Sequence, residues 1–227
     1  MVEMNSRRAM LIFKHTSMAN KEFTHDDAVK LVWRFLNKRE TQIQHHFVEK
    51  PYVWHIVPNG DNFFSLVFSS IFPEITKDFY EEAKSMENGV IEVNSSMVTV
   101  ISVNPIADLD YIGEYLRISS YDLVCQKNVR HKKTSVNATE KEDFCAAIVS
   151  RLVRRAKVFL NLDISEEDIQ VKFPKQLSFG TKKYKDGLIP VQDVEMKLVA
   201  PKEIIELALY SGVGSKSGSG FGTVYSA

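Results

Sequence analysis

The last sixteen residues of the chain restrict its fold more than any other stretch. Five of the ten glycines lie within residues 212–222, in the spacing G-x-G-x5-G-x-G, with one lysine, Lys216, between the two pairs. Glycine at this density loses much conformational entropy on folding, so these positions require backbone angles or close contacts that a Cβ atom would prevent. A short helical pattern opened by Pro201 precedes the loop and a strand pattern at residues 223–226 follows it. The loop therefore connects a helix to a strand.

This order argues against a nucleotide-binding loop. The Ser-Lys-Ser sequence at residues 215–217 superficially resembles a phosphate-binding loop, but that loop requires glycine directly before the lysine and a helix after it. Here Ser215 takes the glycine position and the chain continues into a strand. The dinucleotide fingerprint G-x-G-x-x-G fails for the same reasons, because its third glycine is Ser217 and no helix follows.

Hydrophobic patterning predicts two rounds of the order strand, helix, strand, strand, helix, strand. In the first round, an N-cap signal at Thr24 and a proline at position 73 predict the two helices. The Pro-Asn-Gly-Asp sequence at residues 58–61 predicts a tight hairpin between two strands rich in aromatic and β-branched residues. The predicted strands are residues 8–15, 52–57, 63–69 and 90–93.

The second round repeats this plan with larger insertions. It is predicted to begin with a strand at residues 97–103, followed by a helix over 139–160, a strand at 169–173, a long hairpin over 177–199, the helix after Pro201 and the strand at 223–226. This order is the ferredoxin-like pattern, which RNA-recognition modules also use. We therefore expect an α+β protein of two ferredoxin-like βαββαβ halves packed side by side, residues 1–95 and 96–227.

The charge of the chain is balanced in total but uneven along its length. Lysine plus arginine equals aspartate plus glutamate, 29 each. Residues 126–160 hold nine basic and three acidic side chains, and residues 172–188 hold five lysines and one aspartate. A neutral protein with one basic side suits a polyanionic partner. Ordinary solvated charge explains these runs equally well at this point.

Other features exclude several classes of protein. No apolar run is long enough to span a membrane, and the N-terminus lacks the apolar core of a signal peptide, so a cytoplasmic protein is expected. The two cysteines, Cys125 and Cys145, are not at metal-binding spacing and are expected to be reduced thiols. The histidines form no H-x3-H pair. We expect neither a metal nor a cofactor.

The glycine motif and the doubled fold resemble the CRISPR-associated RNA-processing endoribonucleases of the RAMP superfamily. Val213 and Phe221, each between two paired glycines, fit this family's pattern. Residues 102–106 (Ser-Val-Asn-Pro-Ile) and 46–51 (His-Phe-Val-Glu-Lys-Pro) are similar to further family segments. The resemblance implies metal-independent cleavage of CRISPR repeat RNA into guide RNAs, in which a 2′-OH attacks the adjacent phosphate and leaves a 2′,3′-cyclic phosphate and a 5′-OH. The alternative is a RAMP subunit that holds guide RNA without cutting it.

The resemblance also implies candidate catalytic residues. His46 is the first choice for the acid–base role because it follows the first helix, where the family has its histidine, and a histidine near neutral pKa suits that role. His45 is the second choice, and Lys50 is a candidate for contacting the phosphate. Two surface histidines and an ordinary exposed lysine remain the alternative. Many relatives have a tyrosine on the first helix, where this chain offers only Trp33, which cannot transfer a proton.

The expected RNA-binding residues are basic side chains of the second half together with the loop glycines. The arginines belong to a helix that we expect to dock on RNA, although a solvent-exposed helix face explains them as well. The hairpin lysines resemble the family hairpin near the cleavage point, although an ordinary polar turn explains them as well. The expected partner is CRISPR repeat RNA, as a stem-loop or a single strand, while other effector subunits and a homodimer stay open. The RNA-binding set is Lys132, Lys133, Arg151, Arg154, Arg155, Lys182, Lys183, Lys185, Gly212, Gly214, Lys216, Gly220 and Gly222.

Overall fold

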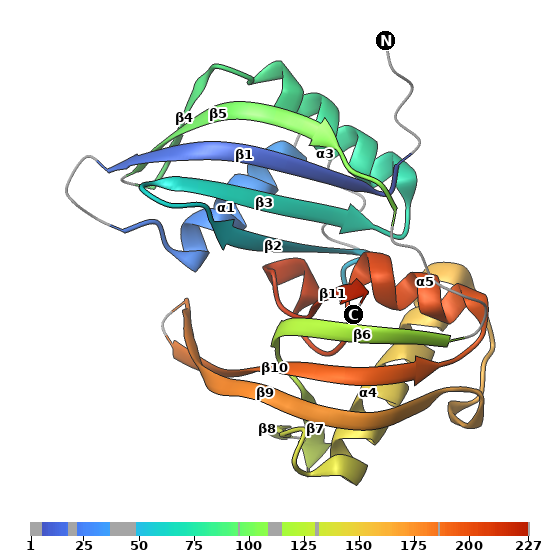
Figure 1. Ribbon diagram of the computed structural model, residues 1–227. Helices are drawn as coiled ribbons and strands as arrows, with labels where there is room; N and C mark the ends of the chain where they lie inside the picture. Colours follow the sequence, from blue (N-terminus) through green and yellow to red (C-terminus); the bar gives the residue numbers. More distant parts are fainter. Residues whose placement is uncertain are drawn as a thin grey trace. The chain divides into compact units, whose positions relative to one another are not determined.

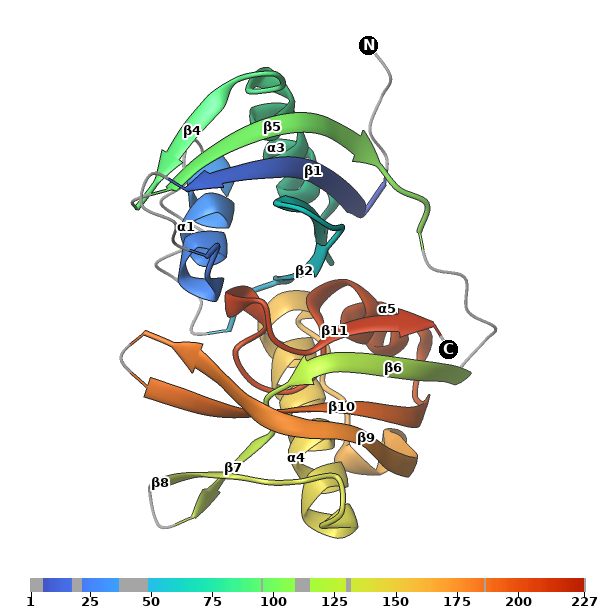
Figure 2. The same cartoon turned by 60° about the vertical axis from the view of Figure 1, so that its left-hand side comes forward.

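The computed structural model describes residues 6–17, 22–36, 49–94, 96–108, 115–129, 132–185 and 187–226. The chain forms two compact units, Met1–Asp108 and Leu109–Ala227. Each unit contains its own antiparallel sheet and its own helices (Figures 1 and 2). Within the described residues, no helix is both long and apolar enough to cross a membrane.

The first unit is a five-stranded antiparallel sheet in the order β2-β3-β1-β5-β4, with two helices on one face (Figure 2). Side chains of both helices and of the strands form one buried core, in which the rings of Phe68 and Phe79 stack at 4.3 Å. The elements are β1 (Arg8–Ser17), α1 (His25–Leu36), β2 (Tyr52–Pro58), β3 (Phe63–Ser70), α3 (Pro73–Ser85), β4 (Val90–Val93) and β5 (Ser96–Pro105).

Local sequence signals explain the elements of the first unit. Thr24 begins α1, where its backbone N–H and its hydroxyl both donate to the buried Asp27 carboxylate, at 2.9 and 2.7 Å, and the Asp27 N–H donates back to the hydroxyl at 3.3 Å. This reciprocal arrangement satisfies donors that a helix start leaves open. Pro73 begins α3, and the predicted turn joins β2 to β3. These predictions are confirmed.

The boundary between the units differs from the predicted one. We expected the strand at residues 97–103 to start the second half, but β5 pairs with β1 along its length and with β4 in a hairpin. Asn94 adopts a left-handed φ of 55° in the β4–β5 turn, a conformation that asparagine tolerates better than most residues. The first unit therefore extends to Asp108.

The second unit is a complete ferredoxin-like fold. Its four-stranded sheet has the order β11-β6-β10-β9, and its chain order is β6, α4, β9, β10, α5, β11. The strand that opens this half is thus β6. From the sequence we expected residues 108–135 to be an insertion with strands near residues 115–118 and 122–125, and β6 covers most of these positions. The elements are β6 (Tyr115–Leu123), α4 (Lys141–Arg155), β9 (Gln170–Tyr184), β10 (Gly187–Val199), α5 (Lys202–Ser211) and β11 (Thr223–Ser226).

Two short additions decorate this second sheet. A separate two-stranded ribbon, β7 (Gln126–Val129) with β8 (Lys132–Ser135), lies between β6 and α4 in the chain. Helix α4 continues as a π-helical turn, Ala156–Leu160, which ends at Asn161 in a left-handed conformation. The expected α+β class with two sheet-bearing halves is confirmed.

Candidate nucleic-acid interface

The glycine loop (residues 212–222) connects α5 to β11, as predicted. Gly212, Gly214, Gly220 and Gly222 have φ values of 77°, 75°, 81° and 76°, which L-residues rarely adopt. A Cβ atom at Gly222 would lie 2.0 Å from the carbonyl oxygen of Val213, and one at Gly214 would lie 2.4 Å from a methyl carbon of Leu123. These two positions therefore require glycine for space as well as for conformation.

The interior of this loop is packed rather than open. Val213 and Phe221 are completely buried, and Phe221 packs with Val124 and Val191. The Val213 N–H donates to the carbonyl of Gly222 at 2.9 Å, which closes the loop on itself.

Only Lys216 and Ser219 of the loop are partly exposed. The four glycines of the predicted RNA-binding set, Gly212, Gly214, Gly220 and Gly222, are buried. This burial corrects their assignment: they shape the loop, and the side chains of Lys216 and Ser219 are the loop groups open to a ligand.

Arg155 is the internal support of the glycine loop. Its side chain is completely buried. One guanidinium nitrogen donates to the carbonyls of Ser211 at 3.2 Å and Gly212 at 2.7 Å, and the other donates to the carbonyl of Gly214 at 3.2 Å and the hydroxyl of Ser217 at 2.6 Å. A planar guanidinium suits this task because its N–H groups diverge in a fixed fork.

The prediction that Arg155 contacts RNA is therefore wrong. A buried guanidinium whose donors point into the loop has no surface to offer a phosphate. The sequence contained a signal for this, because Phe144, Ile148, Leu152 and Arg155 follow the 3.6-residue period of one helix face, and the first three are buried. The prediction relied on the positive charge of Arg155 and not on its position on the apolar face of the helix.

The other two predicted arginines of α4 differ from Arg155 and from each other. Arg151 is half-buried and donates to the Ser215 hydroxyl at 3.0 Å, so it also reaches the glycine loop. Arg154 is exposed. The basic helix is consequently divided: Arg151 and Arg155 hold the loop, and Arg154 faces solvent.

The tip of the β9–β10 hairpin lies against the glycine loop through Tyr184. Its hydroxyl is 2.9 Å from the Ser219 hydroxyl, and its ring meets the Phe221 ring edge-on at 5.7 Å between centroids. The ammonium of Lys216 lies 4.9 Å from the centre of the Tyr184 ring, and that of Lys185 lies 5.7 Å from it. These distances are within the range of cation–π attraction.

Three predicted lysines meet at this place. Burial lowers the pKa of Lys216, and the positive charges of Lys133 and Lys185 lower it further. Lys133 comes from β8, Lys185 from the hairpin tip and Lys216 from the loop, so three distant segments supply one lysine cluster (Lys133, Lys185 and Lys216). Mutual repulsion of this kind is relieved when an anion binds. The arrangement is suited to a phosphate.

The remaining predicted lysines of the second unit lie at different places. Lys182 forms an ion pair with Asp122, which reduces its availability to a phosphate. Lys183 alternates with it along β9 and is exposed. Lys132 lies in β8, and its side chain is outside the described part of the structure.

The predicted catalytic residues belong to the first unit. His45 and His46 lie outside the described residues. Lys50 is half-buried directly before β2, and burial lowers its pKa, which makes its ammonium easier to deprotonate than that of a surface lysine.

Two other histidines, which we expected from their strand and cap positions to be structural, pack against aromatic rings. His15 is buried in β1 beside Phe23, at 5.4 Å between ring centroids, and His25 stacks on Trp54 at 5.2 Å. Among the residues that the structure describes, no group of three His, Cys, Asp or Glu side chains could hold a metal ion. Cys125 and Cys145 are both free thiols.

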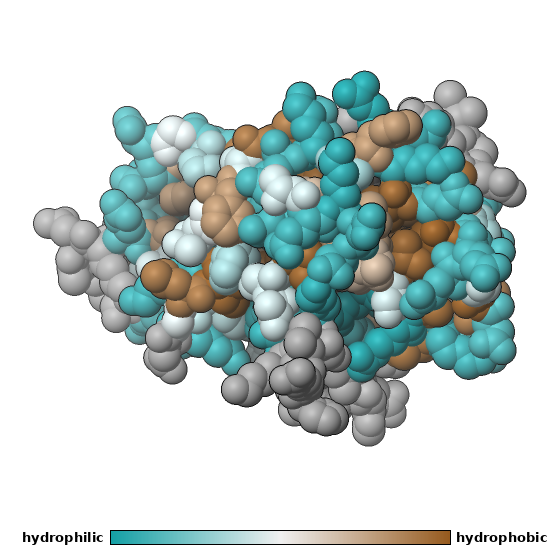
Figure 3. Space-filling view, turned by 90° about the horizontal axis from the view of Figure 1, so that it is seen from below, coloured by the Kyte–Doolittle hydropathy of each residue, from teal (hydrophilic) through white to brown (hydrophobic). Residues whose placement is uncertain are grey.

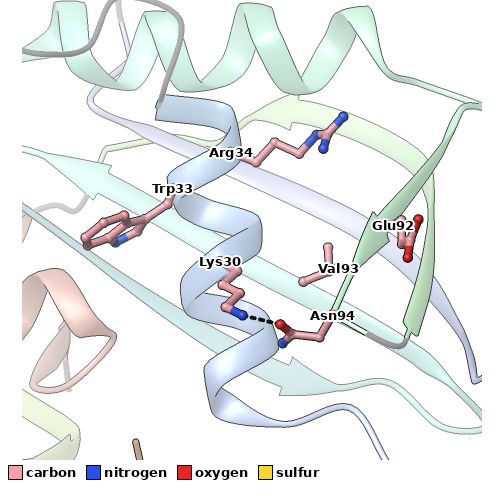
Figure 4. A pocket seen from close by; sticks show the side chains of 6 residues that line it. All are labelled: Lys30, Trp33, Arg34, Glu92, Val93 and Asn94. Carbon is pink, nitrogen blue, oxygen red and sulfur yellow. Dashed lines mark hydrogen bonds between the residues drawn. The ribbon is translucent and has the colours of Figure 1, made fainter.

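A pocket of about 350 Å³ lies in the first unit between α1 and β4 (Figure 4). The ammonium of Lys30 donates to the side-chain oxygen of Asn94 across it, while Trp33 extends from α1 on the other side of that helix. The lining residues, Lys30, Trp33, Arg34, Glu92, Val93 and Asn94, include none of the predicted site residues.

Comparisons with solved structures give the same fold. A structure described as the characterisation of a Cas6-related gene from Pyrococcus furiosus superimposes with a TM-score of 0.80 at 16% identity, over 98% of this chain and 99% of that one. A RAMP protein binding different RNA substrates gives 0.76 at 15% identity, over 97% and 99%. A Cas6 product complex gives 0.75 at 14%, over 98% and 100%. At these identities the likeness shows the fold. No curated protein matches the chain.

The family model for the C-terminal part of the CRISPR-associated protein Cas6 matches residues 118–225, which contain the glycine loop, both arginines that hold it and the whole lysine cluster. The resemblance of this region to CRISPR-associated RNA-processing proteins, predicted from the sequence, is confirmed by this match.

Proposed function

We propose that this Cas6-like CRISPR RNA-processing protein is a metal-independent endoribonuclease that cuts CRISPR repeat RNA into guide RNAs. The observation that carries the RNA-binding part is the lysine cluster, in which Lys185 and Lys216 lie over the Tyr184 ring and Lys133 repels Lys216. The cluster lies in the region that matches Cas6. The related solved proteins include one that binds different RNA substrates and one Cas6 in complex with its product. Phosphate contacts supply most of the affinity in such complexes.

In the proposed binding mode, the second unit holds the RNA backbone. Lys133, Lys185 and Lys216 neutralise phosphates, and the packed loop beneath Lys216 fixes its backbone. Arg154 adds a positive charge on α4. Because these groups belong to strands, a hairpin tip and a braced loop, the site presents its charges at fixed positions before RNA arrives, which reduces the entropy lost on binding.

In the proposed reaction, the 2′-OH of the RNA attacks the adjacent phosphate. One group must accept the hydroxyl proton and another must donate a proton to the departing 5′-oxygen. We assign one of these roles to His46, with His45 as the second choice, and we assign Lys50 to the negative charge that develops on the phosphate. The products are a 2′,3′-cyclic phosphate and a 5′-OH.

The test is cleavage of the cognate repeat RNA in EDTA by the wild-type protein and by His46→Ala and His45→Ala. The wild type should cut at one position, and His46→Ala should lose at least about a hundredfold in rate, the lower end of the range for acid–base catalysis. Loss in His45→Ala alone would move the role to His45. Undiminished cleavage by both variants would contradict the catalytic assignment.

A second candidate function is a subunit that binds guide RNA without cutting it. The observation favouring it is that the lysine cluster presents cations, and Tyr184 and Ser219 beside it present hydroxyl groups, which suit the binding of a phosphate. This candidate predicts tight binding of repeat RNA that stays intact. Binding and cleavage measured on the same RNA separate the two functions.

A further inference from the structure

Strand β9 is the free edge of the second sheet, and it is irregular. Its pairing with β10 shifts register twice, between Lys172 and Lys175 and again between Gln176 and Ser178. Each shift inserts one extra residue into β9, the definition of a β-bulge. In the first bulge, Phe173 and Pro174 together lie opposite the single residue Met196, and in the second bulge Leu177 is the extra residue.

The first bulge displays an aromatic ring. Phe173 is 81% exposed, the largest exposure among the large hydrophobic residues described. It also has a φ of 52°, a left-handed conformation that is unfavourable for a bulky side chain. Two unfavourable features at one residue, exposure of a phenyl ring and backbone strain, point to a functional reason for its placement.

The charged side chains of β9 near Phe173 are all cationic, while the partner strand β10 places Glu195 opposite Lys175. Lys172, Lys175 and Lys183 are exposed, and β9 contains no acidic residue. Within the described residues, Lys172 and Lys175 form no ion pair. Phe179 is also exposed, but it pairs with the buried Gln192 and therefore lies on the other face of the sheet from Lys175, which pairs with Glu195. An aromatic ring next to lysines is the combination that binds single-stranded nucleic acid.

The geometry points to a single-stranded RNA site on β9: we propose that an unpaired segment of the RNA lies along residues 172–175, with a base stacked on Phe173 and with Lys172 and Lys175 on the phosphates. This inference rests on the proposed function, since the RNA is the same molecule. It adds a contact site that is separate from the lysine cluster and specific for unpaired bases.

The structure disfavours a protein strand as the occupant of this edge. Pro174 has no N–H to donate to a neighbouring strand, and the two bulges interrupt the regular row of backbone N–H and C=O groups. Both features prevent another strand from pairing with a sheet edge. If β9 of a second copy paired with this edge, the four lysines of each strand would face one another and repel. On the face of the molecule shown in Figure 3, hydrophobic side chains form separate groups among hydrophilic ones, unlike a continuous protein-binding patch.

The test uses the full chain and two probes, a labelled oligoadenylate and an abasic oligonucleotide of the same length and charge. Phe173→Ala should bind the oligoadenylate about 5- to 100-fold more weakly, because stacking on one aromatic side chain contributes that much per base. Its affinity for the abasic probe should be unchanged. Phe173→Trp should bind as the wild type does. Phe173→Leu, which is apolar but not aromatic, should resemble Phe173→Ala.

The matched control is Val90→Ala, which removes a 55% exposed apolar side chain from β4, the edge strand of the other sheet. It should change neither affinity. Thermal unfolding should show equal stability for Phe173→Ala and wild type, since the ring has few contacts to lose.

Equal oligoadenylate binding by wild type and Phe173→Ala, with repeat RNA still bound and cut, would overturn this inference and leave the proposed function intact. Wild-type binding by Phe173→Leu, or a change of oligomeric state in Phe173→Ala during sedimentation, would also overturn it in favour of a protein contact. Failure of the wild type to bind any RNA would overturn the proposed function itself.

Discussion

The guanidinium of Arg155 lies 2.7 Å from the carbonyl oxygen of Gly212 and is completely buried. Through this bond and three others, one side chain of α4 fixes the conformation of a loop more than fifty residues away in sequence. The charge is accommodated because every described partner of the two terminal nitrogens is an oxygen atom. Removing it leaves three backbone carbonyls without their donor, which is the situation that destabilises folded proteins most.

We therefore predict that Arg155→Ala destabilises the protein by at least about 3 kcal/mol, since each orphaned buried carbonyl contributes about 1–3 kcal/mol. The stability of Arg155→Lys should lie between those of the wild type and Arg155→Ala, because one ammonium cannot reach all four oxygens. The exposed neighbour is the control, and Arg154→Ala should change stability by less than about 0.5 kcal/mol. Urea denaturation measures all three. Equal stabilities for Arg155→Ala and Arg154→Ala would contradict the role of Arg155.

The glycines offer a second comparison. Gly222→Ala should destabilise the protein by about 2 kcal/mol or more, because the new Cβ atom would clash with the Val213 carbonyl at 2.0 Å and the φ is positive. Gly180→Ala is the control, since nothing lies within 4 Å of the position its Cβ would take. That variant should be neutral or slightly stabilising. Thermal unfolding of the pair checks the prediction, and a tolerated Gly222→Ala would refute it.

Lys216 should have opposite effects on folding and on RNA binding. Burial and two neighbouring lysines hold its pKa below the usual lysine value. The unfolded chain then binds the proton more readily, so stability rises with pH between the folded pKa and about 10.4. Lys216→Met should remove this rise and leave stability at neutral pH unchanged or higher.

The same Lys216→Met variant should bind RNA more weakly and reduce the slope of log affinity against log salt by about one. Lys202→Met is the control, because that lysine is exposed on α5 and pairs with Glu206. It should leave the salt slope as it is. An unchanged slope in Lys216→Met would show that Lys216 does not contact phosphate.

His15 should make the protein sensitive to acid. It is buried beside Phe23, and its Nε2 has no hydrogen-bond partner among the residues that the structure describes. Burial lowers its pKa, and the Asp27 carboxylate partly opposes this effect. Because the folded pKa is below the unfolded value of about 6.5, stability is full above that pH and is lost as the pH falls towards the folded pKa. His15→Phe should lessen this loss. Denaturant unfolding of the wild type and His15→Phe at a series of pH values tests this prediction. Parallel dependence of the two unfolding free energies on pH would contradict it.

Much of this fold was predictable because its signals are local. The hairpin turn at residues 58–61, the Thr24 cap and Pro73 are each decided by neighbouring residues, and each prediction was confirmed. The assignment of β5 failed because its partner is decided by the sheet: a strand of alternating apolar residues can pair in either half, and only the contacts with β1 place it in the first.

The candidate site shows the same division. The sequence indicated Lys133, Lys185 and Lys216 as separate basic residues, but their electrostatic interaction depends on long-range packing. Arg155 was mistaken for a surface residue because charge usually means exposure, whereas here a loop rich in buried carbonyls holds it inside. Phe173 was not singled out, since a bulge with a left-handed residue has no simple sequence pattern.

The measurement that tests the central claim most directly is sequencing of the RNA that co-purifies with the protein, combined with analysis of its 3′ ends. The proposed function predicts fragments that end at one position within a CRISPR repeat and carry a 2′,3′-cyclic phosphate. Intact repeat transcripts, or ends with a free 3′-OH at scattered positions, would contradict it.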